Sequence, residues 1–344
     1  MSKYKFLIIS PSWVGDMIMA QSLFKNLKEQ YPNCIIHVLA PKSSLALTTF
    51  MPEVSKAILG DFKHNKFNFF KRIKLGKCLR KNNYTHAIVL PNSWKSSIVP
   101  FAAGISIRRG WLGEQRYLLL NQYKKLNKNL FPLMIDRFNA LTTSKFNASI
   151  DPRNLYPEFI IPNDVTTNII KKFNINNLQE KIITICPGAE FGPAKKWPSQ
   201  YFAQFTNFYI KQGFRVWILG GPNDIETSKE ILKEVNNLNQ IEDYTGKTTL
   251  IEAIALLNLS KAILSNDSGL MHAASALKKK VLVIYGSTSN KFTPPLSQSA
   301  EIIYNEDINC RPCFKRVCPL EHTNCLRDLN PSLVIKKFNE LLNN

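Results

Sequence analysis

The stretch AILSNDSGLMHAASA, residues 262–276, decides the fold class of this chain. Its first four residues have the length and apolar character of a buried strand, and the small residues after the polar turn continue as a helix. A buried strand that leads straight into a helix is the repeating unit of a parallel sheet with crossover connections. Because open parallel sheets bind ligands beyond the carboxyl ends of their strands, the polar turn is a candidate binding loop.

The same alternation runs through most of the 344 residues, a length that favours two domains. It breaks at residues 151–163, which hold three prolines and show no helical period. We therefore predict an α/β fold of two Rossmann-like, doubly wound domains facing a cleft, residues 1–160 and 161–330, with a closing helix in 331–344. The predicted strands are residues 6–9, 35–40, 87–90, 182–186, 216–219, 262–265 and 281–285, and the main predicted helices are 17–30, 201–212, 250–257, 270–277 and 332–342.

The composition is that of a globular protein, with 44% hydrophobic and 20% charged residues. No apolar run has membrane-spanning length, and the apolar part of the N-terminus, residues 6–9, is too short for a secretory signal. These features predict a cytoplasmic location.

The net charge of +20 favours an anionic partner, although the abundance of Lys, Asn and Ile indicates that compositional bias supplies part of it. The densest basic run, Lys63–Lys81, alternates with aromatic and aliphatic residues. It is typical of an amphipathic helix near an anionic membrane surface, or of an ordinary solvated face. A nucleic-acid-binding protein should carry a recognised module or a stacking motif, and the sequence shows neither.

The loop after residues 6–9 contains Gly15 and Asp16 at the start of a helix. Asp is a preferred N-cap residue, so Asp16 has a purely structural interpretation. The functional interpretation makes Asp16 a general base, because a sugar hydroxyl is too weak an acid to attack without one.

Three loops in the second half are suited to a nucleotide. Residues 187–198 combine two glycines with Lys195 and Lys196, a pattern that fits a phosphate group but is not a Walker A loop. Residues 220–224 are a Gly-rich turn with Asp224, which could accept from ribose hydroxyls or simply belong to a turn. Residues 265–272 open a helix whose N-terminus is an anion site, with His272 one turn in.

Five motifs in this order resemble glycosyltransferase family 9, the ADP-heptose:lipopolysaccharide heptosyltransferases. They are PSWVGDM (11–17), LPNSWKS (90–96), RGWLGEQRY (109–117), CPGAEFGPAK (186–195) and NDSGLMH (266–272). The resemblance covers nearly the whole chain. It implies inverting transfer of L-glycero-D-manno-heptose from ADP-heptose to the first heptose of the lipopolysaccharide inner core, without a cofactor or bound metal.

The resemblance also implies roles for single residues. Asp16 matches the catalytic base, Lys195 the cation that neutralises the donor diphosphate, and Asp267 an acid that contacts the donor sugar. The remaining donor residues that we predict are Lys196, Asp224, Ser268, Gly269, Leu270 and His272, and the predicted acceptor residues are Ser12, Trp13, Gly15, Asn92, Arg109 and Arg116. Ser268 departs mildly from a family pattern that often has threonine. Arg108 and the Lys63–Lys81 run are further candidates for contact with the acceptor or with the inner membrane.

Four cysteines, Cys310, Cys313, Cys318 and Cys325, lie close together near the C-terminus with His322 among them. Such a group can form a structural zinc site, but the spacing lacks the two close pairs of a standard zinc ribbon. Packed free thiols are the alternative, because disulfides are disfavoured in the cytoplasm. We expect no catalytic role for this group.

Three other functions remain open at the level of the sequence. The chain could be a family 9 transferase that acts on a different acceptor position, since acceptor choice is weakly encoded. It could instead be a basic nucleic-acid binder, or a nucleotide-sugar binder without activity. We expect a monomer, although the sequence does not determine the oligomeric state.

Overall fold

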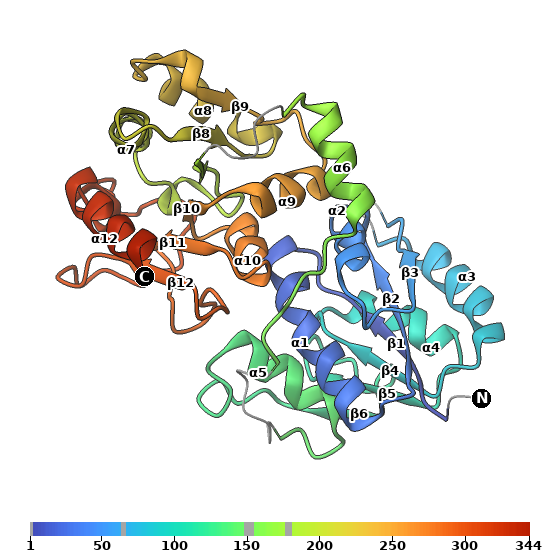
Figure 1. Cartoon of the computed structure of the whole chain (residues 1–344). Coiled ribbons are helices and arrows are strands. Elements are labelled where there is room, and N and C mark those ends of the chain that lie inside the picture. Colours follow the sequence, from blue (N-terminus) through green and yellow to red (C-terminus); the bar gives the residue numbers. More distant parts are fainter. Residues whose placement is uncertain (1–2, 63–66, 148–154, 176–180) are drawn as a thin grey trace. The chain divides into compact units, whose positions relative to one another are not determined.

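The computed structural model describes residues 3–62, 67–147, 155–175 and 181–344 (Figure 1). The chain divides into two compact units, Met1–Pro157 and Glu158–Asn344. The division falls beside the predicted boundary at residue 160, within the proline-containing stretch. The C-terminal helix that we treated separately belongs to the second unit.

The first unit is built on a six-stranded sheet in the order β3-β2-β1-β4-β5-β6. All neighbouring strands in it are parallel. The strands are β1 (Lys5–Ile9), β2 (Ile35–Ala40), β3 (Lys56–Leu59), β4 (His86–Val89), β5 (Ile107–Trp111) and β6 (Gln122–Lys124). The central strands β1, β2 and β4 are buried along nearly their whole length, as both faces of a parallel sheet should be.

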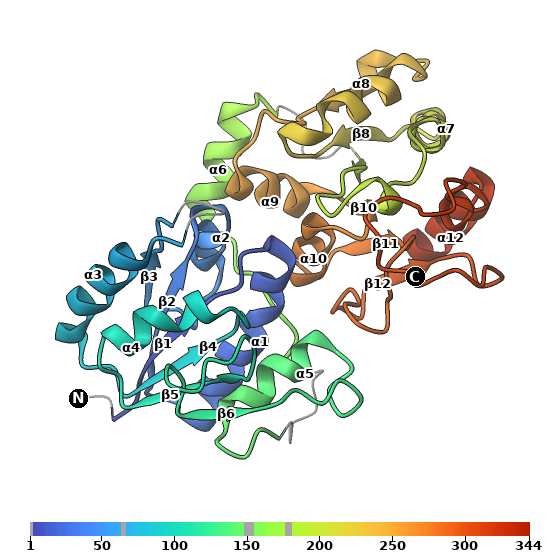
Figure 2. The ribbon, with the colours of Figure 1, turned by 180° about the vertical axis from the view of Figure 1, so that it is seen from behind.

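Helices cover both faces of this sheet (Figures 1 and 2). On one side α1 packs on α5, and on the other α3 packs on α4. Leu7 and Ile9 of β1 share a buried cluster with Leu79 and Val99. The helices are α1 (Val14–Gln30), α2 (Lys42–Leu45), α3 (Phe69–Leu79), α4 (Ile98–Ala102) and α5 (Met134–Asn139).

The second unit repeats the same topology, with the strand order β12-β11-β10-β7-β8-β9 and parallel neighbours throughout. Counted from β7, this is the order 3-2-1-4-5-6 of the Rossmann fold read from the other edge. The strands are β7 (Ile182–Cys186), β8 (Arg215–Ile218), β9 (Ile241–Asp243), β10 (Ala262–Asn266), β11 (Lys280–Ile284) and β12 (Ala300–Ile303).

A buried cluster of this unit joins β7 to the aromatic face of α7 and to α12. Phe205 and Phe338 meet edge to face with their ring centroids 5.0 Å apart. Helices α9 and α10 cover the other face (Figure 2). The helices are α6 (Asn163–Lys172), α7 (Ser199–Lys211), α8 (Ile225–Lys233), α9 (Leu250–Leu259), α10 (Gly269–Ala276), α11 (Asn324–Arg327) and α12 (Pro331–Asn343).

The prediction of two doubly wound α/β domains is confirmed, and every predicted strand is present to within one residue at each end. The strands that we did not predict are β3, β5, β6, β9 and β12. Most of them lie at or next to a sheet edge, where partial exposure replaces the continuous apolar run that marks a buried strand. Among the described residues, no helix is long and apolar enough to cross a membrane.

Each sheet reverses its strand order at one place, between β1 and β4 in the first unit and between β7 and β10 in the second. The loops that leave the carboxyl ends of such strands form the binding crevice of a doubly wound fold. These loops are residues 10–13 and 90–93 in the first unit, and residues 187–198 and 267–268 in the second. Four of the five motifs singled out in the sequence lie at these two places.

Candidate functional site

An ion pair lies at the strand-order reversal of the second unit. Lys195 Nζ is 2.5 Å from Asp267 Oδ2, and the two side chains are only 12% and 4% exposed. Asp267 Oδ2 also accepts a hydrogen bond of 2.5 Å from the hydroxyl of Thr288. Lys195 ends a short 3-10 turn (Pro193–Lys195), and Asp267 directly follows β10. Two distant motifs of the sequence therefore supply one buried charge each to the same point.

Asn266, at the end of β10, holds these two loops together. Its buried amide donates to the carbonyl of Pro187 (2.7 Å), and its side-chain oxygen accepts from the N–H of Trp197 (3.2 Å). The two contacts lie at opposite ends of the loop of residues 187–197. Trp197 is buried and donates through Nε1 to the carbonyl of Leu329 (2.8 Å). The loop that carries Lys195 is thus fixed to the sheet from both ends.

A second ion pair lies beside the start of the same loop. Lys196 Nζ is 2.9 Å from Asp224 Oδ1, and Asp224 Oδ2 accepts from the N–H of Gly221 (3.1 Å). A Cβ atom added to Gly188 would lie 2.1 Å from Asp224 Oδ2, so the carboxylate packs directly on a backbone that has no side chain. Asp224 is almost fully buried, and both of its oxygens have protein partners. The geometry makes Asp224 a partner of Lys196, and its predicted contact with a ribose stays a prediction.

The N-terminus of α10 is capped by a side chain. Ser268 is the N-cap residue, and its hydroxyl accepts from the N–H of Met271 (3.4 Å). Gly269 and Leu270 are the first two helical residues, whose N–H groups have no intrahelical acceptor in an α-helix. The positive end of the helix dipole and the Lys195 ammonium group are therefore available to the same anion.

His272 lies one turn inside α10 and is buried. Burial lowers its pKa to about 4, and the nearby Lys195 ammonium acts in the same direction against the opposing Asp267 carboxylate. The imidazole is therefore neutral at pH 7. It adds no positive charge to the anion site, and any ligand contact that it makes is a neutral hydrogen bond.

The predicted acceptor residues of the first unit gather at its own strand-order reversal. Asp16 is the third residue of α1, and Trp13, not Asp16, occupies the N-cap position. The structure thus excludes the N-cap interpretation of Asp16 and places its carboxylate in the first helical turn. Trp13 is 49% exposed, and Ser12 is exposed beside it. Asn92, also exposed, follows the neighbouring strand β4, so its loop leaves the same edge of the sheet.

Two of the predicted acceptor residues, Arg109 and Arg116, are buried in the first unit. Arg116 is 0% exposed, and its guanidinium donates to the carbonyls of Pro91 and Trp111, both at 2.6 Å. Burial lowers its pKa to about 10, which leaves it charged at pH 7. Arg109 donates to the carbonyls of residues 141 and 142. Arg116 thus supports the loop around Asn92, and Arg109 links β5 to residues 141 and 142. The acceptor contact predicted for both arginines stays a prediction.

Thr288 was not among the predicted site residues, although its hydroxyl contacts Asp267. Its position carried a usable signal, because it lies four residues beyond the end of β11, the strand next to β10. The rule that ligands bind beyond strand ends applied to this loop as it did to its neighbours. The loop Gly286-Ser287-Thr288 lacks a charged residue, so its sequence carries no sign of a ligand-binding group.

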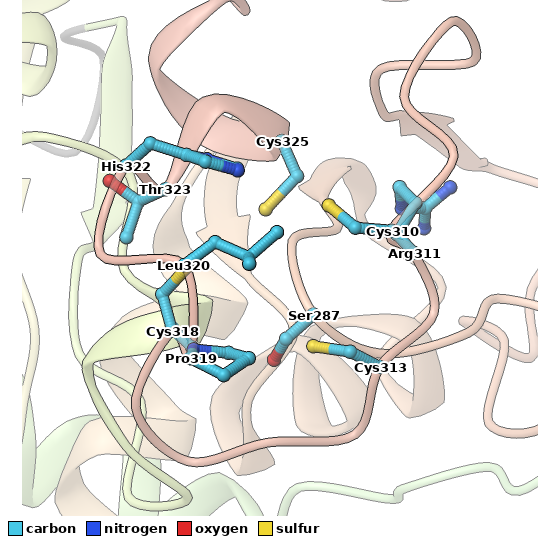
Figure 3. A pocket seen from close by; sticks show the side chains of 11 residues that line it. Ser287, Cys310, Arg311, Cys313, Cys318, Pro319, Leu320, His322, Thr323 and Cys325 are labelled. Atoms are coloured by element: carbon cyan, nitrogen blue, oxygen red, sulfur yellow. The ribbon is translucent and has the colours of Figure 1, made fainter.

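The four clustered cysteines line a pocket together with His322 and Arg311 (Figure 3). Ala194 and Ser287, which are next to Lys195 and Thr288 in the chain, also line this pocket. The nearby thiols and, above all, burial raise the pKa of Cys325 to about 11, so this sulfur is a neutral thiol at pH 7. As they stand, no three His, Cys, Asp or Glu side chains in the described part of the chain are placed to hold one metal ion. The arrangement fits packed free thiols, and metal analysis of protein purified without chelators decides the zinc alternative.

We predict that Gly188→Ala destabilises the fold, because the new methyl group collides with the buried Asp224 carboxylate. Overpacking of this kind costs about 1–3 kcal/mol. Gly221→Ala is the matched control, since its Cβ would meet Asp224 only at 3.9 Å. Denaturant unfolding of both variants measures the difference. Equal unfolding free energies would show that Gly188 is not needed to seat Asp224.

Comparisons with known proteins identify the family of this chain. A family model described as glycosyltransferase family 9 (heptosyltransferase) matches residues 72–324. The chain is 39% identical to lipopolysaccharide heptosyltransferase 2 of Escherichia coli K12, and the match covers 98% of each protein. It is 42% identical to lipooligosaccharide heptosyltransferase 2 of Haemophilus influenzae, and this match covers 98% of this chain and 99% of that protein. The solved structure of E. coli ADP-heptose LPS heptosyltransferase II matches with a TM-score of 0.86 at 38% identity, covering 98% of both chains. The resemblance seen in the five motifs is confirmed, and the chain belongs to glycosyltransferase family 9.

Proposed function

We propose that this glycosyltransferase moves L-glycero-D-manno-heptose from ADP-heptose onto the first heptose of the lipopolysaccharide inner core. The observation that carries the proposal is the Lys195–Asp267 pair at the N-terminus of α10, in a chain whose relatives of about 40% identity are heptosyltransferases 2. An ammonium group and a helix N-terminus at one point suit the diphosphate of a nucleotide sugar.

In this proposal the second unit binds the donor. Negative charge develops on the ADP oxygen as its bond to the anomeric carbon breaks, and Lys195 with the N–H groups of Gly269 and Leu270 stabilises that charge. Asp267 holds the Lys195 ammonium and faces the donor sugar, while Lys196, held by Asp224, adds a second positive charge. His272 is buried and neutral, so it adds no charge to this site.

The first unit supplies the acceptor side. Asp16 takes the proton of the attacking acceptor hydroxyl, whose oxygen forms a bond to the anomeric carbon as ADP leaves from the opposite side. This single displacement inverts the configuration at that carbon. Ser12, Trp13, Gly15 and Asn92 are the residues that we assign to acceptor contact, because they belong to the loops next to Asp16 and most are exposed. Arg116 supports the loop that carries Asn92, whereas Arg109 links β5 to residues 141 and 142.

The acceptor is identified by incubating the purified protein with ADP-heptose and a series of truncated core acceptors, and by measuring the mass of each product. We expect one added heptose on the acceptor that ends in the first heptose, and none on the acceptor that has no heptose. Addition to the heptose-free acceptor would assign a different position in the core. No addition to any acceptor would contradict the proposed function.

We predict that Asp16→Asn lowers kcat by about 10²–10⁴-fold, the usual contribution of a general base, while the affinity for ADP-heptose stays unchanged. Glu29→Gln removes an exposed carboxylate from the other end of the same helix and should have no effect. Turnover at the wild-type rate in Asp16→Asn would remove this residue from the role of base.

A lipid-linked acceptor brings the enzyme to a membrane, and we propose that the outer face of α3 makes this contact. Exposed Phe67, Phe69 and Phe70 begin the face, and exposed Lys71, Lys74 and Lys77 continue it. Phe70 is 83% exposed, and Phe67 stacks between Phe69 and Trp94 with ring centroids 5.6 and 5.8 Å away. Aromatic rings beside a row of lysines suit an anionic interface.

The proposed contact uses only part of the predicted Lys63–Lys81 run. Lys63 and Lys66 lie outside the described residues. Arg72 is buried, donates to the carbonyl of Phe67 (3.0 Å) and lies over the ring of Phe62, so it supports the face from inside. A Cβ on Gly76 would lie 2.6 Å from that of Ala102, which shows how closely the inner side of α3 packs on α4.

We predict that Lys71→Gln, Lys74→Gln and Lys77→Gln together abolish sedimentation with phosphatidylglycerol vesicles at low salt, and that Phe70→Ser weakens it. The control removes the same charge elsewhere, with Lys171→Gln, Lys211→Gln and Lys233→Gln on exposed positions of the second unit. If both triple variants lose binding equally, general positive charge and not the α3 face attracts the vesicles.

A further inference from the structure

The segment of residues 311–316, next to the cysteine pocket, contacts both loops that carry the Lys195–Asp267 pair. Arg311 lies at its start, with a half-buried guanidinium 4.3 Å from the centre of the Tyr304 ring. Arg311 Nε donates to the carbonyl of Gly286 (3.1 Å) and Nη2 donates to the carbonyl of Thr288 (3.0 Å). The planar guanidinium group of Arg311 therefore donates to both ends of the loop of residues 286–288, which follows β11.

That loop reaches the donor site at two points. The hydroxyl of Thr288 donates to Asp267 Oδ2, the oxygen that also receives Lys195 Nζ. The N–H of Ser287 donates to the carbonyl of Ala194 (3.2 Å), the residue before Lys195. A shift of the loop would therefore move the acid and the cation of the pair together.

The other end of the segment holds the lysine loop directly. The N–H of Ala194 donates to the carbonyl of Arg316 (3.1 Å), and the N–H of Phe314 donates to the carbonyl of Ser287 (2.8 Å). A Cβ on Gly192 would lie 2.5 Å from the same Arg316 oxygen, so the two backbones are in close contact. Gly192 also has a φ of 151°, which favours glycine.

We propose that Arg311 is a positioning residue for the donor site, acting through the carbonyls of Gly286 and Thr288 and the Thr288 hydroxyl on Asp267 and Lys195. Arginine suits this task because its rigid fork donates to two carbonyls at once, whereas the single ammonium of a lysine does not reproduce that geometry. Burial lowers the pKa of Arg311, but an arginine stays charged at neutral pH. The inference rests on the proposed function of this site in binding ADP-heptose.

The test compares Arg311→Lys and Arg311→Met with Arg327→Met, an exposed arginine on α11. We expect the Arg311 variants to raise the KM for ADP-heptose and the dissociation constant of ADP about tenfold, with an unchanged KM for the acceptor. Arg327→Met should match the wild type. A general loss of structure would instead lower the melting temperature and affect both substrates, and the conservative Arg311→Lys variant guards against unfolding.

A double-mutant cycle with Thr288→Val tests whether Arg311 acts on the Lys195–Asp267 pair through Thr288. If Arg311 acts through Thr288, the Arg311→Met and Thr288→Val double variant binds ADP no more weakly than the weaker single variant. Additive losses, or wild-type ADP binding in both Arg311 variants, would overturn the inference.

A wild-type protein that binds ADP but transfers no heptose would refute the proposed function. The double-mutant cycle on ADP binding would then still test the role of Arg311. Absence of ADP binding in the wild type would overturn both.

Discussion

The ion pair between Lys195 and Asp267 is the interaction on which the rest of the proposed donor site depends. Two charges that are 12% and 4% exposed lose most of their hydration, and such a pair is stable only with further hydrogen bonds. Asp267 has one from Thr288, and Asn266 next to it fixes both ends of the lysine loop. The Lys195 side chain is therefore held in place before a ligand binds. This lowers the conformational entropy that is lost when the side chain is ordered on binding.

The doubly wound topology explains why these residues meet. Lys195 and Asp267 are 72 residues apart in the chain, but their loops leave adjacent parallel strands, β7 and β10, at the point where the strand order reverses. In the first unit, the segments that contain Asp16 and Asn92 likewise follow two adjacent parallel strands, β1 and β4, at the strand-order reversal. Because both units repeat one strand order, each has its strand-order reversal at the corresponding place.

The sequence predicts the central strands and the charged loops well, because buried parallel strands and Gly-rich turns leave strong local signals. It does not distinguish an arginine that contacts a ligand from one that supports a loop, so it predicts acceptor contact for Arg116 and Arg109 without predicting their backbone partners. Both are charged and lie in a family motif, and only tertiary packing reveals that backbone carbonyls surround them. Thr288 and Arg311 were missed for a related reason, since their roles consist of contacts with distant backbone atoms.

The most direct test of this account is the affinity for ADP-heptose when the buried ammonium group is removed with little change in size. Isothermal titration of Lys195→Met should show a dissociation constant about ten to a hundred times that of the wild type, as expected for the loss of one charge-assisted contact. Lys229→Met, which removes an exposed charge from α8, should leave the constant unchanged. Wild-type affinity in Lys195→Met would contradict the central claim that this ammonium group binds the donor diphosphate.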